Sequence, residues 1–395
     1  MSIKKTIVIG SLFGDEGKGV TTQWLCQQAL DAGEKPLVVR FCGGPQAGHT
    51  IMHNGVTHVC STYGSGTLLG IRTYIARTAY FDPICAWNEY QTLRDKIGEE
   101  NVPKLFVNSH CRVITPWDVL AGRSDDKVVK DGTCGKGLYA TFRKYGMVWG
   151  DEDKSIFDDA SSFGTAETCW ERTKHYYKHL LPYAEYSKLM EEAEDFKKMF
   201  FDAWTEMWDK IEIDDTSGLH IAMDDIDADH IIFEGSQGLL LDMERGFYPN
   251  VTPSRVGLNG LSPEFLQDAD VYFVMRTYLT RHGNGYEPRS TPFLEQSLEG
   301  KYESNIHNAW QGAFKVGWHE QKLLDQAYER HCIDNYRKQY NQKHYLILTH
   351  ADIYPPNVIP LPRYDFDGLW ACYSEEGMIR PLPPLPTSPQ RERSR

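Results

Sequence analysis

Lys5-Thr-Ile-Val-Ile-Gly10 is an apolar run rich in β-branched residues, and Ser11-Leu-Phe-Gly-Asp-Glu-Gly-Lys-Gly19 follows it directly. The apolar run is typical of a buried strand. The segment after it combines glycines with a single lysine. Glycines let backbone N–H groups close around phosphate oxygens, and a helix that follows directs its positive end at the same group. The two segments together predict a strand, a phosphate-binding loop and a helix.

The phosphate-binding loop differs from a Walker A loop in its spacing. Six residues separate Gly10 from Gly17, and Gly19 stands where a Walker A motif has Ser or Thr after the lysine. No hydroxyl can therefore serve a metal ion next to Lys18. Mg²⁺ at phosphate groups commonly takes one or two carboxylates, so Asp15 is the candidate metal ligand of this loop.

The composition excludes several classes of protein. The chain has 395 residues, 41% hydrophobic and 25% charged, which is ordinary for a globular protein. No apolar run approaches the ~20 residues of a membrane span, and no secretory signal is visible. The nine cysteines include no CxxC pair, which predicts reduced thiols and a cytoplasmic protein. The net charge of −13 disfavours direct DNA binding, because that binding depends on cationic contacts to phosphates.

Apolar segments recur along the chain with helical patterns between them. This alternation predicts an α/β fold that is P-loop-like, with a mostly parallel central sheet and flanking helices. We expect one domain over residues 1–380, a helix-rich insertion at about 165–212, and a disordered tail rich in Pro and Arg over 381–395. The strand candidates are Lys5–Gly10, Pro36–Arg40, Lys104–Val107, His230–Glu234, Val271–Leu279 and Tyr345–Thr349.

The insertion is rich in aromatic residues, from Trp170 to Trp208, interleaved with Lys and Glu. One interpretation is a surface that stacks on nucleic-acid bases. The favoured interpretation is a set of amphipathic helices that pack on the sheet.

Further motifs, in order along residues 5–355, resemble the signatures of the adenylosuccinate synthetase family. They are Gly14-Asp-Glu-Gly-Lys-Gly19, Gln46-Ala-Gly-His-Thr50, Gly132-Thr-Cys-Gly-Lys-Gly137, Phe233-Glu-Gly-Ser-Gln-Gly238, Leu241-Asp242, Tyr248-Pro249, Val251-Thr252, Gly317-Trp318 and Leu348-Thr-His-Ala-Asp352. The resemblance implies a C–N ligase that joins L-aspartate to C6 of a 6-oxopurine nucleotide, with Mg²⁺ as cofactor. In the implied mechanism a base removes the N1 proton, O6 attacks the γ-phosphate of a nucleoside triphosphate, and the aspartate amino group displaces the resulting 6-phosphoryl group.

The resemblance also implies roles for individual residues. Asp15 would be the catalytic base and, together with Gly48, a Mg²⁺ ligand. His49 would be the acid that stabilises charge on the transferring phosphoryl group. Both Asp15 and His49 lie in loops just after strands, and parallel sheets gather such loops at one edge. The implied phosphate-binding residues are Gly14, Glu16, Gly17, Lys18, Gly19 and Thr50.

The same resemblance implies which residues bind the other ligands. L-aspartate would contact Gln311, Gly312 and Lys315, and the donor base would contact Asp352. The resemblance implies a homodimer, in which Arg143 would reach across the interface; a solvated surface arginine is the alternative at that position. The implied residues for the substrate nucleotide are Gln46, Thr133, Cys134, Arg143, Gln237 and Thr252.

The chain departs from the family's motifs at four places. Gln46 replaces an asparagine, Ala313 stands where the family has an arginine that reaches the ribose 2′-hydroxyl and the aspartate, and His350 replaces the base-recognition lysine. A Pro-rich tail stands where the family completes its guanine pocket. With these departures the chain resembles the phage-type branch, 2-aminoadenylosuccinate synthetase (N6-succino-2-amino-2′-deoxyadenylate synthase). That branch joins dGMP to L-aspartate with ATP, and a phage-encoded member would lie in the host cytoplasm.

Two alternatives stay open at this point. Several phage members replace the aspartate of the phosphate loop, whereas Asp15 is present here, so an adenylosuccinate synthetase that uses IMP and GTP is the alternative enzyme. A GTPase-like nucleotide-binding module is the alternative from another class. That module predicts Ser or Thr after Lys18, which is missing, and gives no role to His49. We therefore expect an enzyme.

Overall fold

The computed structural model describes residues 3–132, 134–145, 164–214, 227–298, 310–354, 356, 359–373 and 378–382. Its centre is a ten-stranded sheet with the strand order β16-β15-β14-β11-β1-β10-β2-β5-β7-β9. All neighbouring strands are parallel except β15 and β16, which are antiparallel. The predicted α/β fold with a mostly parallel sheet is confirmed.

The elements have the following bounds. The strands of the large sheet are β1 Lys4–Gly10, β2 Pro36–Arg40, β5 Thr73–Ile75, β7 Leu105–Asn108, β9 Ile211–Asp214, β10 His230–Gly238, β11 Asp270–Arg276, β14 Lys343–Thr349, β15 Gly368–Tyr373 and β16 Met378–Pro381. The two-stranded sheets pair β3 His49–His53 with β4 Val56–Cys60, β6 Tyr80–Phe81 with β8 Arg112–Val113, and β12 Leu279–Arg281 with β13 Lys315–Gly317. The helices are α1 Lys18–Asp31, α2 Pro83–Ile97, α3 Pro116–Ser124, α4 Asp126–Lys130, α5 Leu138–Lys144, α6 Ala166–Leu180, α7 Tyr183–Trp208, α8 Pro263–Leu266, α9 Pro292–Leu298, α10 Gln321–Arg330 and α11 Ile333–Tyr340. Single 3₁₀ turns lie at Thr67–Leu69, Glu99–Asn101, Leu239–Leu241 and Leu258–Gly260.

Strand β1 lies in the middle of the sheet because both of its faces are apolar. Ile7 and Ile9 point into one core, and Val8 points to the opposite face, where Leu25 and Cys26 of α1 pack. Parallel strands buried on both faces read as continuous apolar runs, which is the pattern that predicted this strand. The six strand candidates of the sequence correspond to β1, β2, β7, β10, β11 and β14. The three-residue β5, the edge strands β9 and β16, and β15 beside β16 carry weaker patterns and are not among these candidates.

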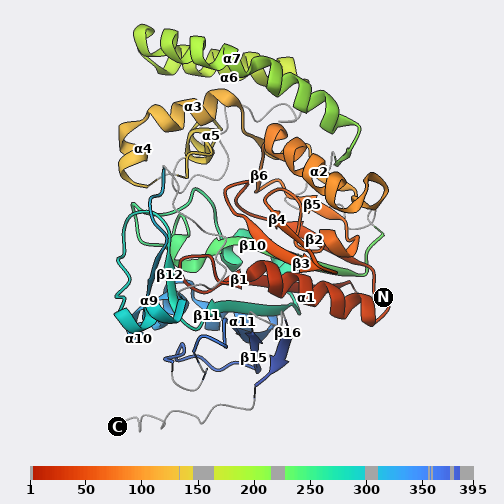
Figure 1. The fold of residues 1–395 in the computed structure, drawn as a ribbon, viewed down its shortest axis with the longest axis vertical. Helices are drawn as coiled ribbons and strands as arrows, with labels where there is room; N and C mark the ends of the chain where they lie inside the picture. The colour runs from red at the N-terminus through yellow and green to blue at the C-terminus, as the bar shows by residue number, and fades with distance from the viewer. Residues whose placement is uncertain are drawn as a thin grey trace.

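The helix-rich insertion forms α6 and α7, which stack beyond α2 and α3 at the far end of the molecule from β15 and β16 (Figure 1). Its aromatic residues Trp170, Phe200 and Trp204 are buried in a cluster that includes Trp117 of α3. The helices are therefore amphipathic, in agreement with the favoured interpretation of the sequence. They pack mainly on α2 and α3 rather than directly on the sheet.

The C-terminal part of the chain departs from the predicted tail at its first residues. Pro381 is the last residue of β16, and the Leu382 amide donates to the carbonyl of Leu369. Residues 378–382 are therefore paired with β15, while 383–395 lie outside the described residues. The division into one domain over 1–380 stays a prediction. Among the described helices, none combines the length and the apolar composition that crossing a bilayer requires.

Candidate active site

A large cavity of about 2050 Å³ lies at the carboxyl ends of the central strands. Pockets for one small ligand span roughly 300–1,000 Å³, so this cavity has room for more than one ligand. Segments far apart in the sequence line it: the loop after β1, the start of β3, the end of β10, the segment 248–253 and the loops that follow β11 and β14. Ligands in open α/β sheets bind at this edge.

The loop between β1 and α1 is fixed through three successive carbonyl groups. Thr280 Oγ1 donates to the Gly14 carbonyl at 3.0 Å, Arg276 Nε donates to the Asp15 carbonyl, and Thr349 Oγ1 donates to the Glu16 carbonyl at 2.7 Å. Strands β12, β11 and β14 therefore hold the loop from one side. Asp15 adopts a left-handed backbone conformation with φ +57°.

Helix α1 begins at Lys18 with no side-chain cap and no acidic residue in its first turn. Its N-terminus therefore keeps its positive end and its N–H groups for an anion. Gly17 has φ +96°, and a Cβ there would lie 2.6 Å from Thr349 Cγ2, so only glycine fits this turn. The buried Lys18 ammonium lies 3.4 Å from Glu16 Oε2. Burial raises the pKa of Glu16, against the lowering effect of Lys18.

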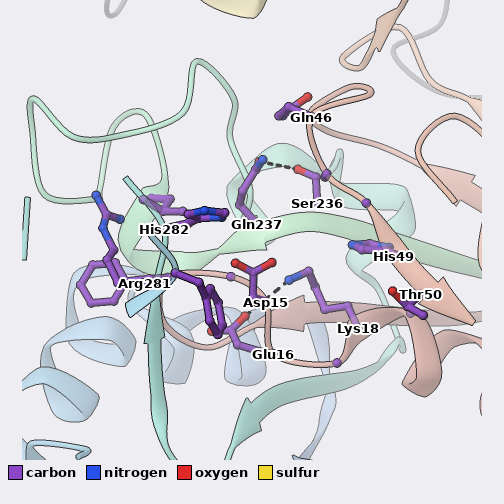
Figure 2. Close-up of a pocket in the computed structure, with 18 of the residues that line it drawn as sticks. Asp15, Glu16, Lys18, Gln46, His49, Thr50, Ser236, Gln237, Arg281 and His282 are labelled. Carbon is purple, nitrogen blue, oxygen red and sulfur yellow. Dashed lines mark hydrogen bonds and ion pairs between the residues drawn. The ribbon is translucent and has the colours of Figure 1, made fainter. Parts of the chain in front are cut away.

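His49 faces the same space from the start of β3 (Figure 2). Its Nδ1 lies 2.6 Å from Glu234 Oε1, and both side chains are buried. Burial alone would raise the pKa of Glu234, but His49, Arg40 and Ser65 outweigh it and hold that pKa at about 2. The carboxylate is therefore ionised and accepts a hydrogen bond from His49 Nδ1–H. This fixes Nε2 as the free atom of the ring, and Nε2 has no partner among the described residues.

The carboxylate of Glu234 is itself held by the turn after β4. The Ser65 amide donates to Glu234 Oε2 at 3.1 Å, and the Ser65 hydroxyl donates to Oε1. Burial lowers the pKa of His49 despite the nearby Glu234 carboxylate. The ring is therefore neutral at neutral pH although Glu234 is ionised, and a second anion, a phosphoryl group next to Nε2, would favour the protonated form.

The predicted nucleotide-binding residues lie around the cavity, with Thr133 outside the described residues. Gln46, Cys134, Arg143, Gln237 and Thr252 all line it. Gln46 Oε1 accepts from the Gly44 amide at 2.9 Å, and Gln237 Oε1 accepts from Ser236 Oγ at 2.7 Å. Each amide oxygen keeps one lone pair for a ligand.

Arg143 pairs with Asp125 at 3.4 Å and lines the cavity of its own chain. A contribution of Arg143 to a partner's site stays a prediction, as does the homodimer.

The predicted aspartate-binding segment is only partly in the cavity. Gln311 lines the cavity, whereas Gly312 and Lys315 do not, and Lys315 pairs with Glu287 at 2.6 Å. Phe314 fills the cavity wall instead, with its ring 5.8 Å from the His282 ring.

The predicted donor-base residue Asp352 lies outside the cavity lining and is exposed. Its neighbours Thr349, His350, Ile353 and Cys372 line the cavity. Burial, followed by the charge of Arg276, lowers the pKa of His350 to about 3, so this imidazole is neutral at neutral pH.

Sequence reasoning missed several residues of the cavity and its support, namely Glu234 as the partner of His49, and Ser65, Arg276, Arg281 and His282. For Glu234 a signal existed, because an ionisable residue interrupts the apolar run of a buried strand. The others follow no local pattern.

The donor atoms present fit a magnesium ion. The half-buried Asp15 carboxylate and the Gly48 backbone line one cavity, next to the phosphate loop. Magnesium prefers such hard oxygen ligands and usually completes its shell with water and substrate phosphates.

The family model of adenylosuccinate synthetase matches residues 7–352. The adenylosuccinate synthetase of Francisella philomiragia is 30% identical over 296 residues, which are 71% of this chain and 64% of the relative. The chain thus spans less than two thirds of that relative's length. The adenylosuccinate synthetase of Mesoplasma florum is 27% identical over 378 residues, which are 89% of this chain and 77% of the relative.

Two solved structures share the fold at 18% sequence identity. A fully ligated adenylosuccinate synthetase from Plasmodium falciparum superposes with a TM-score of 0.61, over 89% of this chain and 77% of its own. A succinoaminodeoxyadenylate synthetase of cyanophage S-2L, bound to dGMP and to dATP as an energy donor, superposes with a TM-score of 0.59, over 90% of this chain and 87% of its own.

Proposed function

The chain belongs to the adenylosuccinate synthetase family, and on that premise we propose that it joins L-aspartate to C6 of a purine nucleotide with cleavage of a nucleoside triphosphate. The acceptor in this proposal is dGMP and the donor is ATP. The products are then N6-succino-2-amino-2′-deoxyadenylate, ADP and phosphate.

The observation that carries the choice of acceptor is the wall formed by residues 311–316. It offers Gln311, Phe314 and Val316 to the cavity, and Lys315 pairs with Glu287 instead. Ala313 is exposed, lies outside the lining and supplies no donor for a sugar hydroxyl. A ribose 2′-hydroxyl buried in the cavity without a partner would lose its hydrogen bonds to water, at a cost of about 1–3 kcal/mol. A deoxyribose avoids this cost.

The choice of base rests on the two glutamines. Gln46 and Gln237 each keep an amide-oxygen lone pair that could accept from the 2-amino group of guanine, a group that hypoxanthine lacks. The cyanophage structure bound to dGMP and dATP supports the same acceptor and an adenine donor.

The choice of ATP rests on His350. Its neutral imidazole lines the cavity where a cationic lysine would favour guanine O6, and Asp352 lies outside the lining.

The proposed chemistry uses the two loops that face each other in Figure 2. Asp15 takes the N1 proton of the base, so that O6 becomes the nucleophile. The N-terminus of α1 and Lys18 hold the phosphates of the donor, and His49 Nε2 donates a hydrogen bond to the phosphoryl group as negative charge shifts onto it. Positioning and charge stabilisation dominate phosphoryl transfer, and this constellation supplies both.

Asp15 and Gly48 would hold Mg²⁺, which neutralises charge on the donor phosphates when bound.

A second candidate is an adenylosuccinate synthetase that uses IMP and GTP. The curated relatives carry that name, and Asp15 is retained at the phosphate loop.

A substrate matrix separates the candidates. IMP, GMP and dGMP are each incubated with ATP or GTP, L-aspartate and Mg²⁺, and succinyl adducts are identified by mass spectrometry. The expected order is dGMP above GMP, with IMP poorest, and ATP above GTP. IMP as the best acceptor, with no adduct from dGMP, would establish the second candidate. No adduct from any pair would refute both.

Ala313→Arg provides the converse experiment. We expect this variant to shift the kcat/KM ratio toward GMP over dGMP, because the new guanidinium can donate to a 2′-hydroxyl. An unchanged ratio would mean that residue 313 does not face the sugar.

A further inference from the structure

Arg281 is a cation that the fold buries without a counter-charge. Its side chain is 3% exposed and lines the cavity, with the guanidinium 4.8 Å from the centre of the Phe13 ring. Nη2 donates to two backbone carbonyls, those of Asn250 and Asn284. Nε and Nη1 are buried with no partner, and no carboxylate in the part of the chain that the structure describes forms an ion pair with Arg281.

Three loops meet at this arginine. Asn284 Nδ2 donates to the Lys130 carbonyl at 2.7 Å, and Asn250 Nδ2 donates to the Asp131 carbonyl at 2.9 Å. These carbonyls belong to the two residues before Gly132, which is the first residue of the predicted nucleotide loop. Arg281 thus lies where that loop, the segment leading to Thr252 and the turn after β12 converge.

Other cationic side chains that line the cavity have protein partners. Lys18 pairs with Glu16, and Arg143 pairs with Asp125. Arg276 donates to the Asp15 carbonyl and to Tyr278 Oη. Burying an unpaired charge is costly, so buried charges in proteins are normally paired. Burial lowers the pKa of Arg281 to about 10, which reflects the same cost. A bound anion would remove it.

We propose that Arg281 binds an oxyanion of a substrate, either the 5′-phosphate of the acceptor nucleotide or a carboxylate of L-aspartate. Guanidinium groups form strong charge-assisted hydrogen bonds with such anions, and Arg281 keeps two N–H donors for them, Nε and Nη1, which lie on different edges of the group. The inference rests on the proposed function for the identity of the substrates. Arg281 would give the aspartate or the phosphate a cationic partner. The segment 311–316 does not supply one, because its Lys315 pairs with Glu287.

The test compares Arg281→Met with a matched control. Methionine is an unbranched apolar side chain that can still pack beside Phe13, and it removes the charge. Arg330→Met is the control, because Arg330 also donates to two backbone carbonyls, at 2.7 and 2.8 Å, and lies 5.1 Å from the ring of Phe247. Arg330 is exposed and does not line the cavity. Arg281→Lys keeps a charge and serves as a second variant should the methionine variant not fold.

Binding is measured by calorimetry without a triphosphate donor, so that no turnover is needed. The ligands are dGMP, IMP and 2′-deoxyguanosine, followed by L-aspartate added to the nucleotide-saturated protein. A lost charge-assisted contact should weaken binding by about tenfold to a hundredfold. If Arg281 holds the 5′-phosphate, Arg281→Met loses affinity for dGMP and IMP but not for 2′-deoxyguanosine. If it holds aspartate, only the aspartate titration weakens.

Thermal unfolding separates binding from a structural role. Without ligands, Arg281→Met should unfold near the wild-type temperature, because the variant also removes the cost of a buried charge. With ligands, the rise in unfolding temperature should be smaller than in the wild type. Arg330→Met should keep the full stabilisation by ligand. Nucleotide and aspartate affinities within twofold of wild type in Arg281→Met would overturn the inference. A wild-type protein that binds IMP but not dGMP would refute the proposed acceptor and leave the Arg281 comparison intact.

Discussion

Glu234 is the residue whose replacement most directly tests the proposed chemistry. Its carboxylate is buried on β10, lies 2.6 Å from His49 Nδ1 and does not line the cavity. Glu234→Gln keeps the size of the side chain and removes its charge. The neutral amide can still accept a hydrogen bond, so His49 keeps its position but loses the counter-charge that stabilises its protonated form.

The expected loss of activity follows from that contact. A hydrogen bond to a charged partner contributes about 1.5–3 kcal/mol, whereas a neutral one contributes roughly half as much. If the charge matters only once His49 is protonated against the phosphoryl group, the loss is about 0.75–1.5 kcal/mol, and kcat should fall by about fourfold to tenfold. The KM values should change little, because Glu234 touches no substrate in the proposed site.

The pH profile of kcat should shift in a definite direction in this variant. The proposed acid is protonated His49, so activity falls as pH rises through the pKa of that ring. Burial already lowers this pKa, and Glu234 opposes the lowering. In Glu234→Gln the pKa should drop further, so the alkaline fall in kcat should move to lower pH. The assay is adduct formation measured from pH 5.5 to 9.

Two variants act as controls for this experiment. Ser65→Ala removes the hydroxyl that donates to Glu234 but leaves its charge, so the alkaline limb should move to higher pH instead. Glu89→Gln alters a second buried carboxylate beside a histidine, His58 at 3.2 Å, outside the cavity. It should lower stability without moving the pH profile. A wild-type kcat and pH profile in Glu234→Gln would refute the reasoning.

Three further predictions concern the phosphate-binding loop and the buried ion pair of Lys144 with Asp118. Asp15→Asn should lower kcat by roughly 10²-fold, measured as adduct formation at saturating substrate, while the thermal midpoint stays near that of the wild type. Removal of Mg²⁺ with EDTA should abolish turnover in both proteins. Mg²⁺-independent turnover would argue against a metal at this site. Gly17→Ala should destabilise the protein by about 1–2 kcal/mol in urea unfolding, because φ at this position is +96° and the new Cβ would lie 2.6 Å from Thr349. A variant with wild-type stability would show that the turn relaxes. Asp118→Asn should destabilise it by about 3–5 kcal/mol, because Lys144 Nζ, 2.5 Å away and 2% exposed, would be left buried without its counter-charge.

Several features of this protein could be read from the sequence alone. The apolar runs that became β1, β2, β10, β11 and β14 are local patterns, and neighbouring residues are sufficient to encode them. The glycines and Lys18 likewise predict a turn into a helix N-terminus, because left-handed conformations and close approach to phosphate both favour glycine. Motif order along the chain then indicated the family, which the match over residues 7–352 confirms.

Only the tertiary structure decided which distant residues meet. Glu234 and His49 are 185 positions apart, and they meet because β10 lies between β1 and β2 in the sheet, an order that no periodic pattern encodes. The pairing of Lys315 with Glu287 and the burial of Arg281 were equally invisible, since each depends on how three loops pack at the edge of the sheet. Local periodicity determines which segments become strands and helices, whereas the partners of a buried charge are set by long-range packing.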